Sequence, residues 1–94
     1  MTLLSVVIPA YNEARFIGTL LDRIKAVDLA ALGIVPEIIV VDDGSADDTA
    51  AIVERAGGVR LLRMERNGGK GRAVRAGIGA ATGDLLIILS LIHI

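Results

Sequence analysis

The sequence predicts an α/β fold, a Rossmann-like, three-layer αβα arrangement with a parallel sheet of about four strands. Two observations predict it. Short runs of Val, Ile and Leu alternate with segments of helical spacing, and the chain is 53% hydrophobic with one Tyr, one Phe and no Trp. Aliphatic runs of this kind are typical of strands covered by helices on both faces. Alternating strands and helices favour right-handed crossovers between parallel strands.

The N-terminal segment predicts one strand followed by one helix. Residues 3–8 form an apolar run that stops at Pro9, which predicts the first strand. Apolar residues then recur at helical spacing over residues 16–27. This pattern predicts a helix that begins at Glu13, with Asn12 as its N-cap.

A second strand and a second helix follow a connection marked by Pro36. Residues 37–41 are almost all apolar and predict a buried strand. Ser45, with Asp48 three residues later, resembles a capping box and predicts a helix over residues 46–56.

The rest of the sequence predicts a third strand, a glycine-rich loop, a third helix and a fourth strand. The third strand is expected over residues 59–64 and the loop over residues 67–71. Thr82 and Gly83 end the third helix, and residues 84–89 predict the fourth strand. A chain of 94 residues allows one small domain.

Charge and composition exclude several classes of protein. The net charge of −1 gives no overall field that would attract nucleic acid. The absence of cysteine excludes a disulfide framework and fits a reducing compartment such as the cytoplasm. The longest apolar run, residues 85–94, is about half the ~20 residues that a membrane-spanning helix needs.

Polar side chains follow the first predicted strand, where an open α/β sheet binds its ligands. Pro9 ends the strand; Tyr11 can stack on a nucleotide base or pack against a ribose, and Glu13 can accept a hydrogen bond from either. The structural alternative is that Pro9 ends the strand while Asn12 and Glu13 only begin a helix.

Two acids, Asp42 and Asp43, close the second strand. A carboxylate there can accept a hydrogen bond from a base or from a ribose hydroxyl. Two adjacent carboxylates beside a phosphate would need a metal ion or cations to offset their repulsion. The alternative is a plain turn, because Asp and Gly favour turns and Ser45 can cap a helix.

The glycine-rich loop carries Asn67 and Lys70 and leads into a helix. Backbone N–H groups at a helix start, together with Lys70, can hold a phosphate. The loop is no Walker A motif, because neither Ser nor Thr follows the lysine. A solvated basic turn is the alternative.

Together, these motifs resemble the N-terminal half of a family 2 glycosyltransferase with the GT-A fold. The resemblance rests on residues 7–13, on residues 40–45 with Asp48 and Thr49 after them, and on residues 66–71. The Asn-Gly-Gly-Lys-Gly loop is most similar to the branch that transfers a sugar to dolichyl or another polyprenyl phosphate.

The resemblance implies that residues 1–89 form the half of the domain that binds a UDP- or GDP-sugar. It implies a divalent cation, Mg²⁺ or Mn²⁺, and a lipid-phosphate acceptor at the cytoplasmic face of a membrane. The residues that it places around the nucleotide are Pro9, Tyr11, Glu13, Asp42, Asp43, Asn67 and Lys70.

The chain departs from the family pattern at its C-terminal end. Residues 90–92 read Ser-Leu-Ile where the family has an Asp-x-Asp metal motif. We therefore expect that residues 90–94 are a truncated or foreign tail, that metal ligands and catalytic residues are absent, and that the fragment has little transferase activity. A non-catalytic nucleotide-binding module is the alternative. A phospho-acceptor domain is disfavoured, because its acids would follow the first strand.

Overall fold

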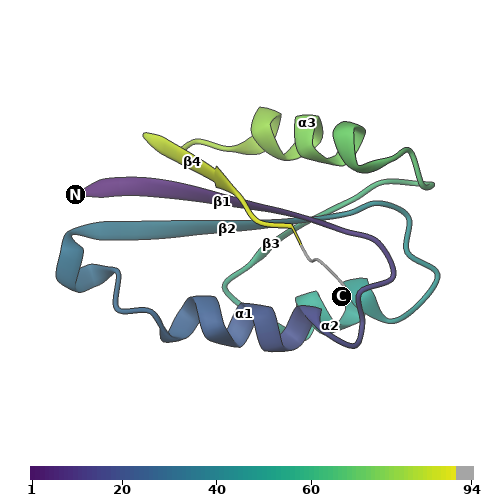
Figure 1. The fold of residues 1–94 in the computed structure, drawn as a ribbon, viewed down its shortest axis with the longest axis horizontal. Coiled ribbons are helices and arrows are strands. Elements are labelled where there is room, and N and C mark those ends of the chain that lie inside the picture. Colours follow the sequence, from purple (N-terminus) through teal and green to yellow (C-terminus); the bar gives the residue numbers. More distant parts are fainter. Residues whose placement is uncertain (91–94) are drawn as a thin grey trace.

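The computed structural model describes residues 1–90, which form one sheet of four parallel strands in the order β3-β2-β1-β4 (Figure 1). The predicted α/β architecture is confirmed. Along the chain the elements are β1 (Thr2–Ala10), α1 (Ile17–Ala26), the 3₁₀ turn η1 (Ala30–Leu32), β2 (Ile34–Asp42), α2 (Thr49–Ala56), β3 (Arg60–Arg63), α3 (Lys70–Ala80) and β4 (Leu85–Ile88).

The helices form two layers around the sheet. Helices α1 and α2 lie on one face, and α3 lies on the other (Figure 1). The chain steps outward from β1 to β3, then returns past β1 to add β4 on its far side. Reversing the direction of travel while keeping right-handed crossovers moves the third helix to the opposite face.

Strand alternation divides the core between these two layers. Val6, Ile8 and Val40 pack with α1 and α2, whereas Val7 and Val41 pack with α3. Successive side chains of a strand point to opposite faces, so odd and even positions of β1 and β2 serve different layers. This rule also decides which polar residues at the strand ends reach which face.

Helix α3 approaches the sheet closely at Gly77. A Cβ added there would lie 2.3 Å from Cγ1 of Val7 and 3.2 Å from Cγ2 of Val41. Only the absence of a side chain allows this contact, which fixes the height of α3 above β1 and β2.

The predicted connection at Pro36 lies inside β2, which is longer than its apolar run. Pro36 pairs with Leu4 of β1, whereas β2 pairs with β3 only from Ile39 onward. Pro36 therefore sits where one side of β2 has no neighbouring strand, and its missing N–H is tolerated there.

Both predicted helix starts were wrong. Helix α1 begins at Ile17 with Phe16 at its N-cap, and α2 begins at Thr49 with Asp48 at its N-cap. Asn12 has a positive φ of 52°, and Ser45 Oγ accepts the N–H of Asn12 at 2.8 Å. Their polar side chains connect two loops instead of capping helices.

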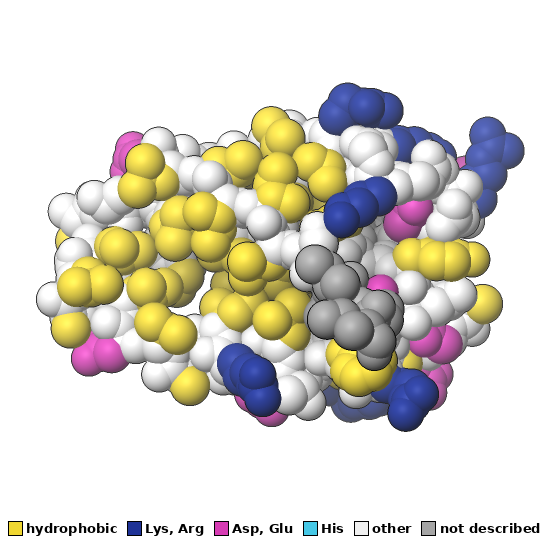
Figure 2. Space-filling model, in the orientation of Figure 1, with side chains coloured by type: hydrophobic (Ala, Val, Ile, Leu, Met, Phe, Trp, Pro, Cys, Tyr) yellow, Lys and Arg dark blue, Asp and Glu magenta, His cyan; other side chains and the backbone are white. Residues whose placement is uncertain are grey.

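Strand β4 forms an edge of the sheet with little cover. All four of its residues are exposed, and Leu85 reaches 56%. Figure 2 shows hydrophobic side chains spread over the face on which Figure 1 draws β4. No helix within residues 1–90 combines the length and the apolar character needed to cross a bilayer. Of the predicted tail at 90–94, only Ser90 belongs to the described residues.

Candidate nucleotide site

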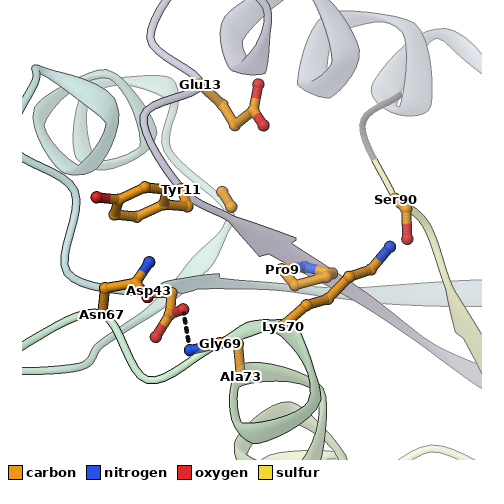
Figure 3. Close-up of a pocket in the computed structure, with 10 residues that line it drawn as sticks. Pro9, Tyr11, Glu13, Asp43, Asn67, Gly69, Lys70, Ala73 and Ser90 are labelled. Atoms are coloured by element: carbon orange, nitrogen blue, oxygen red, sulfur yellow. Dashed lines mark hydrogen bonds between the residues drawn. The ribbon is translucent and has the colours of Figure 1, made fainter. Parts of the chain in front are cut away.

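One cavity of about 240 Å³ lies where the carboxyl ends of β1 and β2 meet the N-terminal end of α3 (Figure 3). Six of the seven residues predicted for the site line it, and Asp42 does not. The lining consists of Pro9, Ala10, Tyr11, Glu13, Asp43, Asn67, Gly69, Lys70, Ala73 and Ser90.

The segment after β1 supplies one wall of the cavity. Pro9 lies at its floor beside the strand, and Tyr11 and Glu13 follow along the loop (Figure 3). Tyr11 is 46% exposed. Its ring therefore offers a free surface to a planar ligand, which is the geometry that stacking on a base needs.

The opposite wall comes from the loop before α3 and the first turn of that helix. Asn67 and Lys70 both line the cavity, and the Lys70 side chain extends toward Ser90 (Figure 3). A lysine at a helix N-terminus adds its charge to the partial positive charge of the helix dipole. This side of the cavity is suited to an anion.

Asp43, directly after β2, also lines the cavity and binds the loop before α3. The residue is 3% exposed, and its two carboxylate oxygens accept the N–H groups of Gly68 and Gly69, both at 2.9 Å. These two N–H groups directly precede α3 and are already paired, so they are not available to a phosphate. Asp43 holds the loop that carries Asn67 and Lys70.

Asp42 faces the other layer of the structure. It is the last residue of β2 and shares the α1–α2 face with Val40, because side chains alternate along the strand. It is 1% exposed, accepts the N–H of Ser45 at 3.0 Å and lies 3.8 Å from Nε of Arg63. Its contacts stabilise the turn after β2, and its predicted contact with a base stays a prediction.

Gly44 allows the β2–α2 loop to contact the β3–α3 loop. Its φ is 75°, and a Cβ added there would lie 2.5 Å from both the carbonyl carbon of Arg66 and the nitrogen of Asn67. The sequence indicated a turn at Gly44, but not this approach of two distant segments. A positive φ and a backbone neighbour both require glycine here.

Two further residues, Asp47 and Thr49, fix the β1–α1 loop. Asp47 was not singled out in the sequence, and Thr49 was named only as part of the motif after β2, without a role. Thr49 Oγ1 accepts the N–H of Glu13 at 2.9 Å and donates to Asp47, whose carboxylate also accepts the N–H of Ala14 at 3.2 Å. Burial raises the pKa of Asp47, but the hydrogen bonds from Thr49 and Ala14 outweigh it, so the pKa lies below the usual value.

The described residues do not fit a divalent cation. Within residues 1–90, no group of three His, Cys, Asp or Glu side chains lies close enough together to hold a metal ion. Of the two cavity carboxylates, Asp43 is engaged with the loop before α3, and Glu13 lies on the wall formed by the segment after β1. Ser90 stands in the lining where the resemblance places an acid. Mg²⁺ and Mn²⁺ need several hard oxygen ligands, with carboxylates among them.

Comparison with known families gives one match that spans nearly the whole chain. The Glycosyl transferase family 2 profile matches residues 5–90. An undecaprenyl-phosphate 4-deoxy-4-formamido-L-arabinose transferase of Klebsiella pneumoniae is 42% identical over 90% of this chain and 27% of its own length. A dolichyl-phosphate beta-glucosyltransferase of Dictyostelium discoideum is 38% identical over 92% of this chain and 29% of its own.

Solved structures of glycosyltransferases share the fold of this chain. A mannosyltransferase from Pyrobaculum calidifontis, in complex with GDP-Man and Mn²⁺, is 30% identical with a TM-score of 0.82, over 93% of this chain and 26% of its own. Glucosyl-3-phosphoglycerate synthase from Mycobacterium tuberculosis, in complex with Mn²⁺ and UDP, is 33% identical with a TM-score of 0.77, over 95% and 33%. The chain thus spans about a quarter to a third of the length of these proteins.

Proposed function

The chain belongs to glycosyl transferase family 2, and from this membership we propose that residues 1–89 bind the nucleotide of a UDP- or GDP-sugar. The single observation that carries the proposal is the convergence of Tyr11, Asp43 and Lys70, from three separate strand and helix ends, on one cavity. An aromatic ring, a carboxylate and a cation are the groups that a base, a ribose and a diphosphate need.

Each wall has a proposed partner in the nucleotide. Tyr11 stacks on the base or packs against the ribose, and Glu13 accepts a hydrogen bond from a ribose hydroxyl. Lys70 and Asn67 lie toward the phosphates, with the N-terminus of α3 behind them. Asp43 holds the loop before α3 in place and lines the cavity beside it.

The acceptor is proposed to be a lipid phosphate at the cytoplasmic face of a membrane. Support comes from two relatives whose names specify undecaprenyl phosphate and dolichyl phosphate. Sugar transfer from a nucleotide diphosphate would call for Mg²⁺ or Mn²⁺ to offset the charge of the leaving diphosphate. Because residues 1–90 do not offer a set of ligands for that cation, we expect this chain alone to transfer little or no sugar.

Calorimetric titration with UDP, GDP and their sugars tests the proposal. We expect binding of one of the two nucleotides, and Lys70→Ala should weaken it about tenfold through loss of a charged contact. Arg75→Ala is the matched control, since it removes one positive charge from the same helix at a residue outside the cavity lining. No heat with either nucleotide, or equal losses in both variants, would contradict the proposal.

A non-catalytic nucleotide-binding module is the second candidate, and the poor fit of the cavity to a metal ion favours it. An assay with Mn²⁺, a sugar nucleotide and dolichyl phosphate can exclude the module. Binding without transfer fits both a module and a donor-binding half, whereas metal-dependent transfer by the 94-residue chain would exclude the module.

A further inference from the structure

Two side chains outside the cavity lining bridge the β1–α1 and β2–α2 loops. Ser45 Oγ accepts the N–H of Asn12 at 2.8 Å, and Asn12 Oδ1 accepts the N–H of Ala46 at 2.8 Å. Each loop thus gives one N–H to a side chain of the other. We call this reciprocal pair the Asn12–Ser45 bridge.

Asn12 adopts a backbone conformation that residues other than glycine rarely take. Its φ is 52°, the one positive value among the non-glycine residues of the described chain. Asparagine tolerates this left-handed region better than most residues do. The left-handed turn occurs between Tyr11 and Glu13, two residues of the cavity wall.

Burial does not fix the Tyr11 ring. The residue is 46% exposed, so packing restrains only part of it. The backbone beside it is held instead by hydrogen bonds across the loops, first by the Asn12–Ser45 bridge and then by Thr49 and Asp47 at residues 13 and 14. A group held in its binding position before the ligand arrives loses less entropy on binding.

We propose that the Asn12–Ser45 bridge is a positioning element that holds Tyr11 and Glu13 at the cavity and thereby raises the affinity for a nucleotide. The part concerning affinity rests on the proposed function. The part concerning position does not, because it describes the free protein. Asn12 and Ser45 act through their neighbours and make no contact with the ligand.

The chain carries its own reporter for the test. Tyr11 is the single tyrosine and there is no tryptophan, so intrinsic fluorescence comes from this residue. Acrylamide quenching and anisotropy of the ligand-free chain therefore report the freedom of Tyr11. Asn12→Gly removes the Oδ1 acceptor but permits a φ of 52°, so it tests the hydrogen bond without backbone strain.

We expect Asn12→Gly and Ser45→Ala each to raise quenching, to lower anisotropy and to weaken binding of the preferred nucleotide about fivefold. The double variant should lose little more than either single variant, because both act in one network. Asn12→Asp keeps an acceptor and should restore Tyr11 quenching to the wild-type level. Ser45→Thr keeps the hydroxyl and should restore affinity.

Asp28→Ala is the matched control. Like the two bridge variants, it removes a side-chain oxygen that accepts a loop N–H, here the N–H of Ala31 at 3.2 Å in the connection after α1. It should change neither the fluorescence of Tyr11 nor the affinity. Thermal unfolding of every variant separates a local effect from a loss of fold, since the bridge variants should stay folded at the temperature of the assay.

The outcomes are distinguishable. Unchanged quenching in both Asn12→Gly and Ser45→Ala would overturn the positioning role. Increased quenching with an unchanged dissociation constant would overturn the link to affinity. A wild-type chain that binds neither UDP nor GDP would contradict the proposed function and, with it, the link to affinity, while the quenching data would still decide whether the bridge positions Tyr11.

Discussion

Helix α3 is held at both ends by carboxylates, one from Glu37 within β2 and one from Asp43 directly after it, and the two ends differ in their surroundings. At its N-terminal end, Asp43 accepts the N–H groups of Gly68 and Gly69 at 2.9 Å. At its C-terminal end, Glu37 accepts the N–H of Thr82 at 2.9 Å and the hydroxyl of Thr82 at 2.8 Å. Both acids tie a connecting segment to the same strand.

The difference lies in what else is close by. Glu37 also accepts the hydroxyl of Ser5 at 2.8 Å, and Ser5 in turn accepts the N–H of Gly83 at 2.8 Å. Glu37 is not among the residues that line the cavity. Asp43 lines a cavity beside Tyr11 and Lys70. A carboxylate that holds a loop is therefore no sign of a binding site by itself; its position at the carboxyl end of the strand makes Asp43 the candidate.

Asp43→Ala should have the largest effect and should damage both stability and binding. It leaves two backbone N–H groups without their charged acceptor at a site that is 3% exposed. We expect a loss of about 4 kcal/mol in the free energy of unfolding, since each hydrogen bond to a charged group contributes ~2 kcal/mol. Urea denaturation followed by circular dichroism measures it, and calorimetry should detect no nucleotide binding.

Asp43→Asn is the control for this change. It keeps one oxygen acceptor and should show roughly half of the loss. A loss below about 1 kcal/mol in Asp43→Ala would mean that other contacts hold residues 67–71. The contrast between the two ends of α3 would then have no energetic basis.

A pair of glycine variants tests whether only the N-terminal end of α3 contributes to nucleotide binding. Gly44→Ala places a Cβ 2.5 Å from the backbone of Arg66 and Asn67 with φ at 75°, and Gly83→Ala places one 2.7 Å from the nitrogen of Ser5. We expect losses of about 3 and about 2 kcal/mol in the free energy of unfolding. Nucleotide affinity should fall only in Gly44→Ala.

Thermal and urea unfolding give the stabilities of both glycine variants, and calorimetry under conditions where both remain folded gives the affinities. Equal loss of affinity in the two variants would show that the turn before β4 is coupled to the cavity. The comparison would then fail, because both ends of α3 would contribute to one site.

The sequence predicted the cavity better than it predicted the loops. Apolar runs and helical spacing were enough for the four parallel strands and three helices, and the rule for strand ends brought Tyr11, Asp43 and Lys70 together. The predicted starts of α1 and α2 were wrong, because Asn12 and Ser45 are ordinary capping residues whose hydrogen-bond partners here lie on another loop. A single sequence cannot distinguish a capping bond from a bond between loops.

The division between Asp42 and Asp43 illustrates a second limit. Two adjacent acids look equivalent in a motif, yet alternation along β2 turns Asp42 to the α1–α2 face and leaves Asp43 at the cavity. That outcome depends on where the strand ends, and β2 extends one residue beyond the apolar run that predicted it. Glu37 was not singled out at all, since its partners Ser5 and Thr82 are distant in the sequence.

The smallest expected effect is a pH dependence confined to the Glu37 end. Hydrogen bonds from the backbone and hydroxyl of Thr82, and then from Ser5, hold the pKa of Glu37 below its usual value of 4.5. A group whose pKa is lowered by folding stabilises the protein above its unfolded pKa, and this contribution is lost as the pH falls through the folded pKa. Glu37→Gln should thus be less stable than wild type at pH 7, with the gap closing as the pH falls below about 4.5. Urea unfolding across that range measures the difference, which cancels the contributions of other acids such as Asp47. A gap that stays constant down to pH 3 would show that the charge of Glu37 does not stabilise this end of α3, and that the shape of its hydrogen-bonded side chain suffices there.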